Sequence, residues 1–106
     1  MPESLYLIQT TTASKEEAEK IAKQLINHQL AACVQISGKI TSIYKWKNKV
    51  QSETEFILNI KTIKSKVQAI ENKILQEHSY ECPEIIAFEI NKTTKKYANW
   101  AYDLLS

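Results

Sequence analysis

The chain has very little glycine, proline and cysteine: one glycine, two prolines and two cysteines occur among its 106 residues. A single glycine excludes a glycine-rich loop of the kind that cradles nucleotide phosphates. The scarcity of glycine and proline also leaves no segment that resembles a flexible linker. We therefore expect residues 1–106 to form a single domain.

Long apolar runs and a strong excess of one charge are also missing. No apolar run approaches the ~20 residues of a membrane-spanning helix, and the start, MPESLYLIQT, lacks the pattern of a signal peptide. The formal charge is only +2, from 14 basic and 12 acidic residues, so we expect no nucleic-acid partner. We expect a cytoplasmic protein in which Cys33 and Cys82 are reduced thiols.

No pattern of catalytic residues is recognisable. Neither His28 nor His78 has a nucleophile or an orienting carboxylate at a spacing that is typical of a catalytic pair. Paired Cys-x-x-Cys and His-x-x-x-His motifs are also absent. We therefore expect a protein that is not an enzyme and needs no obligatory cofactor.

What is present is a regular alternation of strand and helix patterns. Strand patterns cover residues 4–10, 31–36, 40–47, 50–62 and 84–90, and helical spacing of apolar residues covers 14–30, 65–78 and 93–105. This order predicts an α+β, ferredoxin-like βαββαβ fold. Its antiparallel sheet has helices on one face, and a C-terminal helix follows the last strand.

Local signals support the helices. Ser14 with Glu17 and Ser65 with Gln68 are spaced as capping boxes, in which a hydroxyl and a carboxylate or amide satisfy free backbone N–H groups. The apolar residues of the C-terminal helix fall on one face: Tyr97, Trp100, Ala101, Leu104 and Leu105.

The two middle strands are unusually long. If the second strand continues from residue 31 to Trp46, it spans roughly 50 Å, whereas typical strands have about 5–6 residues. Asn48 tolerates positive φ, so Asn48-Lys49 is the expected turn. The hairpin tip would then expose Tyr44, Trp46 and Val50, which invites another chain.

A bend at Ser37-Gly38 that folds the strand back is the alternative. Such a bend would not cover the second face of the sheet. That face carries the apolar residue Ile57, while Phe56 and Leu58 point to the first face. We therefore expect a homo-oligomer.

Three stretches, LAACVQI, TSIYKWKNKVQSETEFILNIKT and HSYECPEIIAFEI, resemble the CutA family of divalent-ion tolerance proteins, and the likeness extends over nearly the whole chain. The resemblance implies a tight homotrimer sealed by the long hairpin strands. It also implies a role in tolerance of copper or other divalent metals, as a binding, scaffold or signalling module, and it implies no enzymatic role.

The chain departs from the family pattern at two places. Asn48 stands where the family usually carries glycine. Copper sites proposed in some members use a cysteine near the end of the first strand and adjacent histidines before the Tyr-Pro motif. Here Thr10 is the nearest match for the cysteine and Glu77 replaces one histidine beside His78, so such a site would be incomplete.

Another metal site is conceivable from Cys33, His78 and Cys82, because thiolates and imidazole suit Cu(I) or zinc. Cys33 lies in an apolar strand, however, where cysteine often serves as a small buried hydrophobe. His78 ends a predicted helix, where it can interact with the terminal carbonyls. Both interpretations remain open, and copper or another divalent metal is an optional ligand.

Polar and aromatic residues also suggest a cleft between subunits. Lys61 lies among apolar strand residues and should need a carboxylate partner if it is partly buried. Such a pair could simply stabilise a subunit seam, or the cleft could bind a small anion or a metal complex. Pro83 stiffens the loop beside it. The candidate cleft residues are Cys33, Tyr44, Trp46, Glu53, Lys61, Tyr80 and Glu84.

Three other functions are alternatives, and two of them belong to proteins with the same topology. A small-molecule sensor like the PII signalling proteins is also trimeric and ferredoxin-like, but the nucleotide loop is missing here. An enzyme with a cleft between subunits is a further alternative. RNA-binding RRM domains are βαββαβ as well, yet the third strand, EFILNIKT, lacks their basic-glycine-aromatic signature.

Overall fold

The protein is built around one four-stranded antiparallel sheet, seen in a computed structural model that describes residues 3–106. The strands are β1 (Leu5–Thr12), β2 (Cys33–Trp46), β3 (Lys49–Ile63) and β4 (Ile85–Ile90), arranged in the order β2-β3-β1-β4. The helices are α1 (Lys15–Asn27), α2 (Val67–Glu77) and α3 (Lys95–Leu105), with a short 3-10 turn η1 (Lys64–Lys66) before α2. The predicted α+β ferredoxin-like fold is confirmed.

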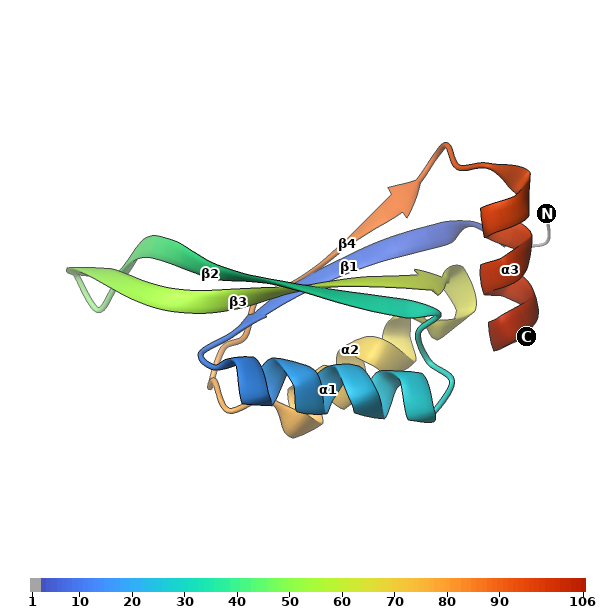
Figure 1. Cartoon of the computed structure of the whole chain (residues 1–106). Helices are drawn as coiled ribbons and strands as arrows, with labels where there is room; N and C mark the ends of the chain where they lie inside the picture. The colour runs from blue at the N-terminus through green and yellow to red at the C-terminus, as the bar shows by residue number, and fades with distance from the viewer. Residues whose placement is uncertain (1–2) are drawn as a thin grey trace.

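Helices α1 and α2 lie side by side on one face of the sheet, and α3 lies at one end (Figure 1). Within residues 3–106, no helix is long and apolar enough to span a membrane.

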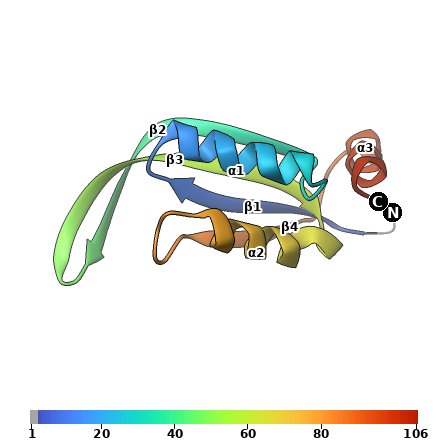
Figure 2. The same ribbon diagram turned by 90° about the horizontal axis from the view of Figure 1, so that it is seen from below.

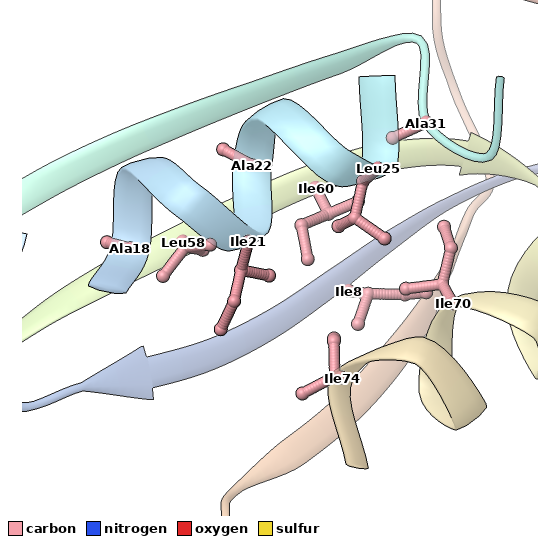
Figure 3. Packing of buried hydrophobic residues seen from close by; sticks show 10 residues of the cluster. All are labelled: Ile8, Ala18, Ile21, Ala22, Leu25, Ala31, Leu58, Ile60, Ile70 and Ile74. Carbon is pink, nitrogen blue, oxygen red and sulfur yellow. The ribbon is translucent and has the colours of Figure 1, made fainter. Parts of the chain in front are cut away.

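The main core lies between the sheet and the two helices α1 and α2. Ile8 of β1 is the register partner of Ile60 of β3, so both side chains point to the same side of the sheet. Figure 3 shows these side chains meeting Ile21 of α1 and Ile70 of α2. All four are almost completely buried. This burial agrees with the helical period of the sequence, which puts Ile21 and Ile70 on the inner faces of their helices. We call this side of the sheet the helix face.

The N-terminus of α1 begins partly as predicted. The Ser14 hydroxyl accepts a hydrogen bond from the Glu17 backbone N–H at 3.1 Å. The Glu17 carboxylate does not complete the capping box, because it accepts hydrogen bonds from the backbone N–H and the hydroxyl of Ser79. That carboxylate therefore ties α1 to the loop that follows α2.

The second predicted capping box is wrong. Helix α2 begins at Val67 after the turn η1, and no side chain caps it. The Ser65 backbone N–H and hydroxyl donate instead to the Glu3 carboxylate, at 2.8 and 3.1 Å. The Gln68 amide donates to Asn72 within the same helix. A tertiary contact to the N-terminal segment thus replaces the local cap.

The hairpin of β2 and β3 extends well beyond the helices, with strands of 14 and 15 residues. The strand does not fold back at Ser37-Gly38: β2 continues to Trp46, and the pairing only shifts register between Ser37 and Ile40. Gly38 is needed there because a Cβ atom would overlap the ring of Phe56. Figure 2 shows the projecting half of the hairpin curving away from the body of the protein.

The tip of the hairpin is a two-residue turn, one position earlier than expected. Trp46 and Lys49 are the last pair of the ladder, so Lys47 and Asn48 form the turn instead of Asn48-Lys49. Both turn residues have positive φ, 51° and 66°, as a type I′ turn requires. The expected positive φ of Asn48 is confirmed.

Helix α3 packs against the end of the sheet through a second core cluster that contains Leu5, Ile63 and Ala101. Leu5 and Ile63 are register partners on the side opposite the helix face. The predicted apolar stripe of α3 is only partly buried, because Tyr97, Trp100 and Leu104 are exposed; the buried positions are Ala98, Ala101 and Leu105.

The rest of the second side of the sheet is open, and we call it the open face. Because side chains alternate along a strand, this face carries Leu7, Ile57 and Phe88, whose side chains point away from the face that carries Ile8 and Leu58. Phe88 is 47% exposed. Helix α3 covers only the end of this face. That another chain covers the rest stays a prediction.

Candidate functional site

A cavity of about 310 Å³ lies where the hairpin leaves the body of the protein, against the loop between α2 and β4. Cavities that hold small molecules in proteins start at about this size. The lining combines three aromatic side chains, three carboxylates, a hydroxyl and a thiol: Tyr44, Trp46 and Tyr80; Glu55, Glu81 and Glu84; Thr11; and Cys82. We call this cavity the hairpin pocket.

Glu55 is the most buried carboxylate of the pocket, with 7% of its surface exposed. Its Oε2 atom accepts hydrogen bonds from the hydroxyls of Tyr80 at 2.7 Å and Thr11 at 3.2 Å. Burial alone would raise the pKa of Glu55. The hydrogen bonds from the hydroxyls of Ser42, Tyr80 and Thr11 outweigh burial, so the pKa of Glu55 lies below its ordinary value of 4.5. The pocket therefore holds a fixed negative charge at neutral pH.

Tyr80 is held in place by its hydroxyl and by its backbone N–H. Burial, followed by the hydrogen bond to Glu55, raises the pKa of Tyr80 above its usual value of 10, so the phenol keeps its proton and donates it. The Tyr80 backbone N–H donates to Nδ1 of His78 at 3.0 Å, and the two rings lie 4.7 Å apart.

His78 is a buried connector between the loop and β1. Its side chain is fully buried, and Nε2 lies 2.6 Å from the Thr11 backbone oxygen, a contact in which the ring must donate. Because Nδ1 accepts from Tyr80, both contacts are satisfied by the neutral Nε2–H tautomer. The ring thus does not serve the carbonyls at the end of α2, the alternative that the sequence left open.

Helix α1 also holds the loop between α2 and β4 in place. The Glu17 carboxylate accepts two hydrogen bonds from Ser79, at 2.8 and 3.0 Å, and Glu17 also lies 3.7 Å from the His78 ring. The pocket side of this loop is therefore built on contacts to two elements of the main fold, which makes its geometry preformed.

The structure brings together four of the seven residues expected in a cleft, and adds Cys82. Tyr44, Trp46, Tyr80 and Glu84 all line the hairpin pocket. Glu53 is exposed, lies two residues nearer the tip than Glu55 and is not part of the lining.

Lys61 and Cys33 lie together at the other end of the open face. They are register partners in β3 and β2. Lys61 is six residues from Glu55 along the strand, or roughly 20 Å at the usual rise. Its ammonium group donates a hydrogen bond to the amide oxygen of Gln35. Within the described residues Lys61 is therefore paired with an amide and not with the carboxylate that the sequence led us to expect.

Two of the predicted site residues sit in contrasting surroundings. Cys82 is exposed at the rim of the pocket, whereas Cys33 is half-buried. Cys33 also lies near Tyr97 of α3, whose pKa burial raises, with a smaller contribution from that thiol. The two thiols are therefore at opposite ends of the sheet.

The three predicted metal ligands do not come together in one chain. His78 has both ring nitrogens engaged, and the two cysteines are far apart. Over residues 3–106 no group of three or more His, Cys, Asp or Glu side chains is arranged to hold a metal ion. Thr10, at the position of the cysteine used in some family members, is fully buried on the helix face.

Sequence reasoning missed Glu55, Thr11 and Glu81. Glu53 and Glu55 share one side of β3, so the alternation could not say which of them is buried. The structure decides it, because only Glu55 lies level with Thr11 and Tyr80.

Comparison with known proteins identifies the family. The family model described as "CutA1 divalent ion tolerance protein" matches residues 6–103. The "Protein CutA homolog" of Xenopus laevis is 38% identical over 96% of this chain and 68% of that protein. The "Protein CutA, chloroplastic" of Arabidopsis thaliana is 36% identical over 89% of this chain and 52% of that protein. The chain thus spans roughly half to two thirds of these relatives.

A solved structure gives the same result for the fold. The crystal structure of the divalent ion tolerance protein CutA1 from Ehrlichia chaffeensis superposes with a TM-score of 0.95 and is 32% identical in sequence. The match covers 100% of this chain and 99% of that one.

Proposed function

Because the chain belongs to the CutA1 divalent ion tolerance family, we propose that it serves in the tolerance of divalent metal ions, copper among them. In this proposal it is a cytoplasmic homotrimer that acts as a binding or scaffold module and not as an enzyme. The observation that carries the proposal is the projecting hairpin beside an uncovered apolar sheet face.

The exposed apolar side chains support self-association. Ile43 and Val50 on the hairpin are each 71% exposed, and Trp46 is 46% exposed. Phe88 and Ile86 add apolar surface on the open face at β4. Extended apolar patches of this kind on a small domain mark contact surfaces, and β2 is an edge strand with free backbone groups.

Sedimentation tests the assembly and its response to metal together. We expect a mass about three times the 12.2 kDa of the chain at neutral pH. The same measurement with Cu(I), Cu(II) and Zn(II) shows whether metal changes the assembly. A monomeric mass in dilute solution would overturn the trimer.

Direct metal binding would be modest, because one chain lacks a closed set of four ligands. Cys82 is the exposed thiol, and thiolates favour Cu(I). We expect binding of Cu(I), titrated under reducing conditions, to depend on Cys82, Cys33 or His78, so at least one of the variants Cys82→Ser, Cys33→Ser and His78→Ala should reduce it. If all three bind as the wild type does, these residues are not the ligands and metal tolerance acts elsewhere in the molecule or through a partner.

A small-molecule sensor is the second candidate, and the hairpin pocket favours it. The pocket is preformed, and it has a charged group and aromatic walls, as sites for small ligands do. An enzyme is less well supported. The one thiol in the lining, that of Cys82, has no imidazole beside it in the lining.

A further inference from the structure

The lining of the hairpin pocket has a charge that selects its ligand. It contains three carboxylates, and no lysine, arginine or histidine is among the lining residues. Lys49, which faces Trp46 across the hairpin, is not part of the lining, and Lys61 lies at the far end of the open face. A small anion, which the sequence suggested as a ligand, is therefore disfavoured in this pocket.

Aromatic rings supply the second element of the site. Tyr44 and Trp46 lie two residues apart on β2, so both side chains point to the same side of the hairpin. Tyr80 faces them from the loop, and all three line the pocket. The faces of aromatic rings attract cations, and the attraction grows when the cation is removed from water.

Glu55 supplies the third element, a fixed counter-charge. Its carboxylate is nearly buried, and two hydroxyls hold the same oxygen, Oε2. The carboxylate cannot swing out to solvent without breaking the bonds to Tyr80 and Thr11. Such a preorganised carboxylate attracts a cation without first having to be ordered.

Size and lining together argue against a bare metal ion. The volume of about 310 Å³ is far larger than one ion needs, and among the described residues no three His, Cys, Asp or Glu side chains are arranged to hold one metal ion. We propose that the hairpin pocket binds a small organic cation, an alkylammonium whose charged head lies between the Glu55 carboxylate and the faces of Tyr44, Trp46 and Tyr80.

This inference rests on the proposed function only in treating the protein as a binding module. It does not depend on copper. An ammonium head can belong to a free amine or to a lysine side chain of a second copy, and the proposal concerns the free amine.

The test uses the whole protein in its native assembly and two probes of the same shape. n-Butylammonium and 1-butanol differ in the charged head and little else. Calorimetry at neutral pH should show the ammonium binding at least about tenfold more tightly than the alcohol, because the cation–π and charge terms act only on the ion. Tetramethylammonium should also bind, whereas acetate should not.

Three variants locate the binding. Glu55→Gln keeps the shape of the side chain and should weaken n-butylammonium binding about tenfold, and Tyr44→Leu should weaken it several-fold. Glu53→Gln is the matched control: it removes a carboxylate from the same strand outside the lining and should leave binding unchanged. Circular dichroism checks that each variant is folded.

Fluorescence gives an independent readout. Trp46 and Trp100 are the two tryptophans of the chain, so in Trp100→Phe the emission reports on the pocket alone and should change on addition of n-butylammonium.

The proposal fails if the wild type binds neither ammonium probe, which is also the result expected if a lysine of a second copy fills the pocket. It fails equally if 1-butanol binds as tightly as n-butylammonium, or if Glu55→Gln binds as the wild type does. Sedimentation of the same samples reports the trimer separately. Loss of amine binding with an intact trimer would overturn this inference and leave the proposed function standing.

Discussion

The two halves of the long hairpin have similar sequence patterns and different surroundings. Near its base, Leu58 and Ile60 lie on either side of the polar residue Asn59 and are completely buried beneath α1 and α2. Near its tip, Ile43 and Val50 also alternate with polar residues, yet each is 71% exposed. Alternation selects the side of a strand to which a residue points, whereas burial depends on whether another layer covers that side.

The base of the hairpin therefore belongs to the fold of one chain, and the tip is available for contacts beyond it. The hairpin pocket lies where the two halves meet, with Glu55 just before the first core residue of β3. Substitutions in the base should act on the stability of the chain, and substitutions at the tip should act on assembly.

The largest effect is expected in the base. Ile60→Ala should lower the free energy of unfolding by about 2–5 kcal/mol, because it removes buried methyl groups and leaves a cavity between β3 and α1. Urea unfolding measures the change. The control Ser52→Ala, at an exposed position of the same strand, should stay within about 0.5 kcal/mol of wild type. Equal losses in both variants would remove the distinction between base and tip.

At the tip, Trp46→Ala should weaken association by about 2 kcal/mol, or roughly thirtyfold, since buried tryptophans are frequent hot spots of interfaces. Helix content measured by circular dichroism should not change, because Trp46 contacts neither core cluster. Lys45→Ala, which points to the other side of the strand, is the control for sedimentation at low concentration. Retention of the full assembly by Trp46→Ala would show that the tip is not a contact surface.

Where the halves meet, Tyr80→Phe should lower the free energy of unfolding by about 1.5 kcal/mol, because a hydrogen bond to the charged carboxylate of Glu55 is lost. A double-mutant cycle with Glu55→Gln isolates the interaction between the two side chains. Additive losses in that cycle would mean that the Tyr80–Glu55 contact does not contribute.

This contact should also be sensitive to pH, with a defined sign. The folded pKa of Glu55 is below its unfolded value near 4.5, so its contribution is present above pH 4.5 and is lost as the pH falls through the folded pKa. Unfolding measured at pH 7 and near pH 3 should show a smaller acid loss in Tyr80→Phe than in wild type. An identical acid loss in both proteins would contradict this assignment.

The order of elements and the main core could be predicted from the sequence because both depend on local periodicity. Ile8, Ile21 and Ile70 follow the strand and helix periods and are buried as expected. The turn was one residue out, since Lys47 gives no sequence signal for positive φ. The cap at Ser65 was wrong because Glu3, 62 residues away, competes for the same backbone group.

The site could be predicted only in part, for a related reason. Tyr44 and Trp46 are conspicuous in the sequence as aromatic residues on an overlong strand. The choice of Glu55 over Glu53 depends on where Tyr80 and Thr11 lie, which is a matter of tertiary contacts. The same holds for Lys61, whose neighbour Gln35 on the adjacent strand takes the place of a carboxylate.

The central claim is that the hairpin tip and the open face are completed by other copies of the chain. Thermal unfolding over a hundredfold range of protein concentration tests it most directly, because folding and assembly are then coupled. We predict that the Tm rises with concentration, by roughly 5–10 °C over that range for a domain of this size. A reversible transition whose Tm does not depend on concentration would contradict the account.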